Sequence, residues 1–198
     1  MLKEKEINDI IKHYTTFLGD LEEINYKPQS SLSVKPVLLL SKATEERPYN
    51  VVATVGMSEY KLKGIYNNCE LIMLLDDKWK FKMDNINHNW PFELLSNVAN
   101  EICVSKEKFC YGQYFVNENN KTFCALTDMS VALIAIPVML DKTFFELKSG
   151  KKTINFFVLT TATFDELKLI KHIGGINFIQ RYLLPEGENA FIIRNNQL

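Results

Sequence analysis

A glycine and a serine at the end of an apolar run are the first residues whose types could do chemistry. The run covers residues 50–55 and leads directly to Gly56 and Ser58. In some hydrolases a Gly-x-Ser-x-Gly turn after a strand exposes a nucleophilic serine. Here Tyr60 occupies the position of the second glycine. The motif is therefore incomplete, and we expect a turn in which Ser58 bonds to nearby backbone.

A serine nucleophile also needs a base, and the three histidines give little support for one. His13 falls within an expected helix, His88 within a polar loop and His172 near an expected helix end. The last position is typical of a cation that interacts with the helix dipole. We therefore expect no catalytic residue, and a hydrolase is the least favoured class of function.

Three aspartates lie between residues 76 and 84, and they are candidate ligands for a metal ion. Asp76, Asp77 and Asp84 lack the alternating ligands and the glycine of a calcium loop, and Lys78 and Lys80 lie between them. The four cysteines include no Cys-x-x-Cys pair, and Gly174-Gly175 lacks the spacing of a phosphate-binding loop. We therefore expect neither a metal nor a cofactor.

Charge and hydropathy exclude further classes of function. The chain has 198 residues, a net charge of -1, 46% apolar residues and 24% charged residues, which is typical of a folded globular protein. No basic field is present to hold nucleic acid directly. The longest apolar run, at 131–140, is too short to span a membrane. The first residues show no secretory signal, so we expect a cytoplasmic protein.

Three helices are predicted by the spacing of apolar residues. The first covers about residues 2–19 and ends at Gly19, and the second begins near Pro91, which suits a first helical turn. The third follows Thr163, with Phe164, Leu167 and Ile170 expected to face inward. A glutamate three residues after Thr163 completes a capping box. Gly174-Gly175 ends this helix, and a last short helix is expected at 176–183, before Pro185.

Short runs of branched and aromatic residues predict the strands. They lie at 36–40, 50–55, 69–75, 111–116, 122–126, 131–138 and 154–162. Because strands and helices do not alternate strictly, the expected fold class is α+β, with a mixed β-sheet packed with helices. No repeat or linker divides the chain, so we expect a single domain over residues 1–198.

The order of several segments resembles the suppressor of fused (SUFU) domain family. In that family a strand ending in Gly-x-Ser, a Glu-Leu strand, a Trp-Pro helix start, a glycine-containing strand and a late strand with a Thr-x-x-Glu helix recur in this order. The matching segments are TVGMS (54–58), CELIMLL (69–75), WPFELLSNVAN (90–100), YGQYF and INFFVLTTATFDELKLIK (154–171). The resemblance covers about residues 35–183. It implies that Gly56 and Ser58 belong to the fold.

The resemblance implies a non-catalytic, protein-binding function. Compact single-domain bacterial members look like immunity proteins, or antitoxins, which neutralise a cognate protein toxin, often a nuclease, by stoichiometric binding. An adaptor that holds a cellular protein or peptide along a sheet edge is the alternative. The sequence does not decide the oligomeric state.

The candidate partner-binding residues are Asp76, Asp77 and Trp79. An aromatic residue beside carboxylates in an expected loop is typical of an interface anchor with charges that steer association. An equally good interpretation has Trp79 folded onto the core, because tryptophan is usually mostly buried. Other acidic positions are Glu22, Glu23, Glu45 and Glu46.

Overall fold

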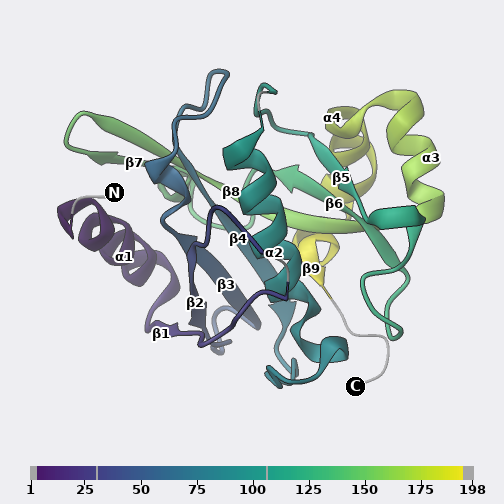
Figure 1. The fold of residues 1–198 in the computed structure, drawn as a ribbon, viewed down its shortest axis with the longest axis horizontal. Coiled ribbons are helices and arrows are strands. Elements are labelled where there is room, and N and C mark those ends of the chain that lie inside the picture. Colours follow the sequence, from purple (N-terminus) through teal and green to yellow (C-terminus); the bar gives the residue numbers. More distant parts are fainter. Residues whose placement is uncertain (1–3, 30, 106, 194–198) are drawn as a thin grey trace.

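Buried side chains alternate along the central strands and give the sheet two apolar faces. In β3 (Tyr49–Val55), Val51 and Ala53 pack into one hydrophobic cluster, whereas Val52 packs into the other. Strands buried on both faces need a covering layer on each side. The computed structural model describes residues 4–29, 31–105 and 107–193, and Figure 1 shows helices on both sides of the sheet.

The sheet is mixed, with the order β1-β2-β3-β4-β8-β6-β5, while β7 also pairs with β8 and β9 with β4. β4 runs parallel to β8 and to β9, and the other pairs are antiparallel. The remaining strands are β1 (Glu22–Glu23), β2 (Val37–Ser41), β4 (Cys69–Asp76), β5 (Tyr114–Val116), β6 (Met129–Ala135), β7 (Glu146–Ser149), β8 (Lys152–Thr163) and β9 (Ile192–Ile193).

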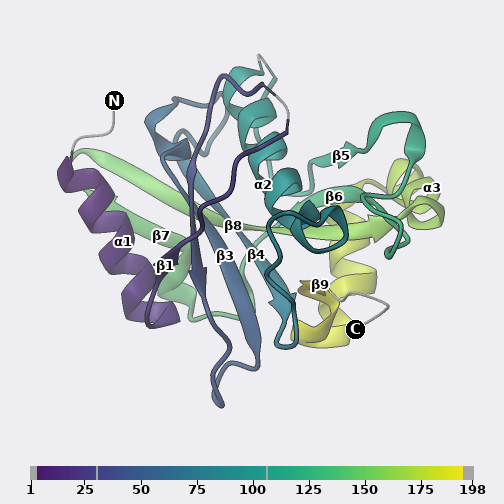
Figure 2. The ribbon, with the colours of Figure 1, turned by 60° about the horizontal axis from the view of Figure 1, so that its bottom comes forward.

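Helix α2 (Ile86–Val104) covers one face, and the other helices cover the opposite face. Those helices are α1 (Glu4–Leu18), α3 (Phe164–Ile173) and α4 (Gly175–Phe178), which continues through a π-turn at Ile179–Leu183 and a 3-10 segment at Leu184–Phe191. Figure 2 shows α1 and α3 at opposite ends of the sheet. No helix among the described residues is both long and apolar enough to cross a membrane.

Most of the expected elements are present. The α+β domain with a mixed sheet is confirmed, and so is the capping box, in which the Thr163 side chain accepts from the Glu166 backbone N–H and the Glu166 side chain accepts from Thr163. Gly174 caps α3 with a φ of 83°, as the Gly-Gly pair indicated. The first residues of the expected N-terminal helix lie outside the described residues.

Three local predictions were wrong. Helix α2 begins five residues before Pro91, because Asn85 caps it and accepts a hydrogen bond from the Asn87 backbone N–H at 3.0 Å. Phe164 is 42% exposed, because the first position of α3 lies before the turn that faces the core, and Lys168 covers its ring. The expected strand at 122–126 is absent. The carbonyls of Lys121 and Thr122 instead accept from the Asn117 side chain, which turns the chain back.

Candidate protein-binding groove

The incomplete serine motif is a structural turn built around a buried glutamate. Ser58 and Glu70 are both 0% exposed. One oxygen of the Glu70 carboxylate accepts from the backbone N–H groups of Gly56 at 3.0 Å and Ser58 at 2.9 Å. The other accepts from the Thr54 hydroxyl at 2.7 Å and from the Met57 N–H at 3.3 Å. The carboxylate thus satisfies the backbone donors that begin the 3-10 turn at Met57–Glu59.

The environment of this turn does not suit a nucleophile. A nucleophilic serine must be accessible, and Ser58 is fully buried. The expected bond from the Ser58 side chain to nearby backbone is wrong, because the hydroxyl faces the Glu70 carboxylate and has no hydrogen bond of regular geometry. Burial raises the pKa of Glu70, and the hydrogen bonds from Ser58, Thr54 and Gly56 partly oppose this shift. Gly56 has a φ of 117°, which explains why glycine stands there.

Metal ligands and His13 are two further candidates for chemistry. No group of three or more His, Cys, Asp or Glu side chains could hold a metal ion in this part of the chain. His13 is buried, its Nε2 lies 2.9 Å from the Phe144 carbonyl oxygen, and its ring stacks on Phe156. Burial lowers the pKa of His13, so the neutral ring is favoured. This histidine is part of the core.

The three predicted contact residues lie at the end of β4, but they do not form one exposed cluster. Asp77 is exposed and Asp76 is half-buried, with its side chain accepting from the Lys78 backbone N–H at 3.0 Å. Trp79 is only 4% exposed, and its indole N–H donates to the His88 carbonyl at 2.9 Å. Its ring packs edge-on against Trp90 at a centroid distance of 5.9 Å. Trp79 therefore supports the start of α2 from within.

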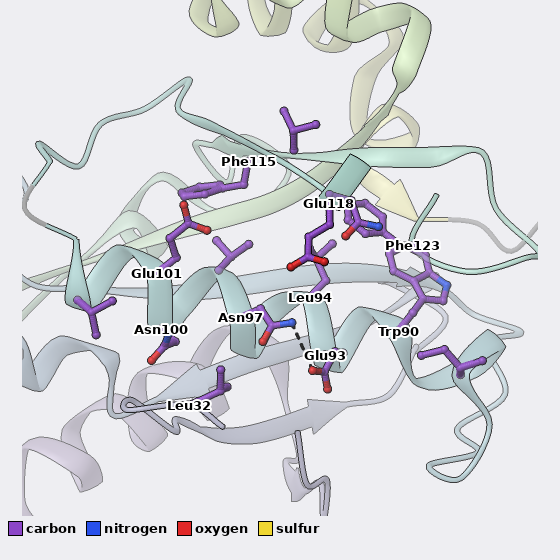
Figure 3. A pocket seen from close by; sticks show the side chains of 15 residues that line it. Leu32, Trp90, Glu93, Leu94, Asn97, Asn100, Glu101, Phe115, Glu118 and Phe123 are labelled. Carbon is purple, nitrogen blue, oxygen red and sulfur yellow. Dashed lines mark hydrogen bonds between the residues drawn. The ribbon is translucent and has the colours of Figure 1, made fainter. Parts of the chain in front are cut away.

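A groove between α2 and β5 is lined by Trp90, the residue against which Trp79 packs. Its volume is about 520 Å³, and Figure 3 shows its lining side chains. Trp90, Leu94 and Val98 contribute the α2 wall, and Phe115 and Phe123 contribute much of the facing wall. Mostly apolar concave surfaces with a few polar groups are typical binding sites. We call this surface the α2–β5 groove.

A segment from the N-terminal half holds the other side of α2 in place. This crossing segment comprises residues 24–29 and 31–34. The Glu93 carboxylate accepts from the Tyr26 hydroxyl and, at 3.0 Å, from the Gln29 backbone N–H. The Asn100 side-chain oxygen accepts from the backbone N–H groups of Ser33 and Val34, each at 3.0 Å. These bonds fix α2, so the groove wall is preorganised.

Strand β5 forms the facing wall and ends the sheet. Ile134 N–H donates to the Gln113 carbonyl and Asn117 N–H to the Ser130 carbonyl, each at 2.9 Å. Backbone groups alternate in direction along an antiparallel strand, so those of Tyr114 and Val116 point away from β6. No strand of the described chain pairs with that side. The edge therefore has backbone donors and acceptors for an added strand.

The groove is acidic. Glu93, Glu101 and Glu118 line it, together with Asn97, Asn100 and Asn117, and no lysine or arginine does so among the described residues. Partial burial raises the pKa of Glu101, and the charge of Glu107 raises it further. The sequence analysis did not predict this acidic lining. Its signal is the polar stripe at 93, 97, 100 and 101, whose spacings of four, three and one place these residues on one face of a helix.

Comparisons with known proteins agree with this architecture. In solved structures the chain is similar to a SUFU (suppressor of fused protein) homolog from Neisseria gonorrhoeae, with a TM-score of 0.66, 13% identity and coverage of 93% of this chain and 92% of that one. It is also similar to a chain of the Sufu-Fu complex, with a TM-score of 0.62, 14% identity and coverage of 98% and 89%. These identities establish a likeness of fold alone.

The similarity to Drosophila Suppressor of Fused covers 98% of this chain but only 49% of that one, with a TM-score of 0.60 and 13% identity. This chain thus spans about half the length of that protein. No curated protein matches the sequence. The model of the family described as Suppressor of fused protein (SUFU) matches residues 29–194, which is most of the chain. The protein therefore belongs to the SUFU family.

Proposed function

We propose that this protein is an immunity protein that neutralises a cognate bacterial toxin by stoichiometric binding, and that the α2–β5 groove is its contact surface. SUFU proteins are non-catalytic protein-binding regulators. The observation that carries the proposal is the groove itself: an apolar, preorganised cleft with carboxylates on both walls and an open strand edge beside it. Its acidic character suits a nuclease toxin, whose nucleic-acid-binding surface is basic.

The predicted contact residues fit the same proposal in different roles. Asp77 is exposed, and its charge can steer a basic partner toward this end of the molecule. Trp79 is buried behind Trp90, so its contribution is to hold the α2 wall. Partner binding by Asp76, Asp77 and Trp79 stays a prediction.

The test is co-expression with the protein encoded next to this one. We expect that neighbour to stop growth alone and growth to return when this chain is present. A Val104→Arg substitution should abolish the rescue, because Val104 lines the groove and is 52% exposed, so an arginine there blocks the groove while the fold tolerates it. Val138→Arg is the matched control, since Val138 is 53% exposed and lies outside the groove lining.

The possible results distinguish the immunity function from its contact surface. A neighbour that is harmless alone, or that stays toxic with the wild-type chain present, contradicts the immunity function. Equal rescue by the two arginine variants contradicts the groove as the contact surface.

An adaptor that holds a cellular peptide is the second candidate, and the open edge of β5 favours it. Val116→Pro tests strand addition, because the Val116 N–H points outward and proline is tolerated where that group is not bonded within the sheet. We expect a folded variant, by circular dichroism, that no longer captures the peptides pulled down by the wild-type chain. Unchanged capture by the proline variant rules out pairing at this edge.

A further inference from the structure

The carboxylates of the α2–β5 groove are not equivalent, and their differences indicate what the groove selects. Glu93 is engaged by the crossing segment, through Tyr26 and Gln29, and by the Asn97 side chain at 3.3 Å. The Glu93 carboxylate therefore holds the crossing segment against α2. Glu101 and Glu118 lie on opposite walls, on α2 and on the 3-10 turn at Glu118–Asn120.

Glu101 and Glu118 have no cationic partner among the described residues. The ion pairs of this part of the chain join Lys42 to Glu22, Lys148 to Glu146, Lys152 to Glu6 and Lys168 to Asp165. In Figure 3, Glu101 lies at one end of the groove next to Phe115, and Glu118 reaches from the β5 side toward Leu94. The two carboxylates thus lie at different points along the groove, with apolar side chains around them.

A cation is the group that this arrangement lacks. Glu101 is near Glu107, a like charge, and partial burial removes part of its hydration, so a bound cation would offset both costs. Trp90 adds a second unsatisfied group: it is 1% exposed, lines the groove and has an indole N–H without an acceptor in the described part of the chain. A peptide supplies both a side-chain cation and a backbone carbonyl acceptor.

We propose that Glu101 and Glu118 are the specificity-determining residues of the α2–β5 groove, and that they select a partner segment in which lysine or arginine alternates with apolar side chains. This inference rests on the proposed function and names the chemistry of the partner. The apolar side chains of the segment pack against Leu94, Val98 and Phe115, and its cations pair with the two glutamates. An acidic segment is rejected by like charge.

Synthetic peptides test the selection directly. The probes are fluorescein-labelled peptides Lys-Val-Thr-Val-Lys-Val-Thr-Val-Lys, the same peptide with Gln in place of Lys, and the same with Glu. We expect the lysine peptide to bind roughly tenfold more tightly than the glutamine peptide by fluorescence anisotropy, from two partly exposed ion pairs. The glutamate peptide should bind most weakly.

Double substitutions test whether Glu101 and Glu118 cause the preference for the lysine peptide. Glu101→Gln combined with Glu118→Gln should remove most of the preference for lysine. The control combines Glu45→Gln with Glu46→Gln, which makes the same change in net charge at exposed positions outside the groove lining. The control should keep the preference, and thermal melts check that both proteins stay folded.

Three results overturn the inference: no binding of the lysine peptide, equal affinity for the lysine and glutamine peptides, or an equal loss of preference in the two double variants. Co-expression keeps this outcome separate from that of the proposed function. If the Glu101→Gln, Glu118→Gln variant rescues growth as well as wild type, the charge selection is wrong while the immunity function holds. If wild type fails to rescue, the immunity function is wrong whatever the peptides show.

Discussion

Glu70 shows how a single buried side chain can explain a motif that resembles a catalytic one. Its carboxylate binds the backbone of Gly56 and Ser58, so those residue types follow from a turn that must present its N–H groups to an acceptor. The sequence alone could identify the turn, because a glycine after a strand indicates one. It could not identify the acceptor, which lies 14 residues away from Gly56 on the neighbouring strand.

Replacing Glu70 with glutamine should destabilise the fold by about 2 kcal/mol, because the amide presents an N–H₂ group to backbone donors and leaves some of them unsatisfied. Chemical denaturation measures this. The pKa of Glu70 is raised above 4.5 in the folded state. A raised acid pKa contributes stability at low pH that is lost as pH rises through the folded value. The advantage of wild type over the variant should therefore shrink as the pH rises above 4.5.

Ser58→Ala should change little. The hydroxyl is buried and has no regular hydrogen bond to a described residue, so we expect a change in unfolding free energy of less than about 1 kcal/mol and unaltered partner binding. Denaturation curves and the co-expression assay measure the two effects. Loss of a hydrolytic activity in this variant would contradict the structural interpretation of the turn.

At the scale of elements, α2 is held by side chains that the helical pattern did not reveal as important. The apolar spacing predicted the helix, yet Asn100 and Glu93 determine where the crossing segment lies. Their acceptors meet backbone N–H groups more than 60 residues away in sequence, and no local rule finds such pairs. The same limit explains the absent strand at 122–126, where the amide of Asn117 decides the conformation.

The Asn100→Ala substitution tests whether the Asn100 side chain anchors the crossing segment to α2. Two backbone N–H groups lose their acceptor, so we expect a destabilisation of about 1 to 2 kcal/mol and faster amide hydrogen exchange at Ser33 and Val34. The Gln29 amide is the internal control, because it donates to Glu93 and should keep its protection. Equally faster hydrogen exchange at all three amides would indicate that the variant unfolds as a whole, and not that the crossing segment alone detaches from α2.

At the scale of the whole molecule, two glycines bring the groove side and the C-terminal helices together. A Cβ on Gly175 would lie 2.0 Å from the carbonyl oxygen of Gly112, the residue that leads into β5. The Gly174-Gly175 pair predicted a helix end, which is right for Gly174. The role of Gly175 depends on a neighbour 63 residues earlier in the chain, so only the folded structure reveals it.

The Gly175→Ala substitution distinguishes two effects on stability: the close contact with the Gly112 backbone and the helix propensity of residue 175. Alanine favours helix over glycine by about 1 kcal/mol, so propensity alone predicts a more stable protein. The clash is with backbone, which cannot rotate away, and overpacking of this kind costs about 1 to 3 kcal/mol. We therefore expect a lower melting temperature by calorimetry. A higher melting temperature would mean that the two backbones separate freely.

The fold class and most elements were predictable, because alternating and helical spacings are local signals. The mixed topology depends on β8, which pairs with β4, β6 and β7. Since β4 ends at Asp76 and β8 begins at Lys152, all of residues 77–151 must be synthesised before β4 can acquire this neighbour. Until then the nascent chain carries an unfinished apolar sheet, so we expect a greater need for chaperones during synthesis than after it.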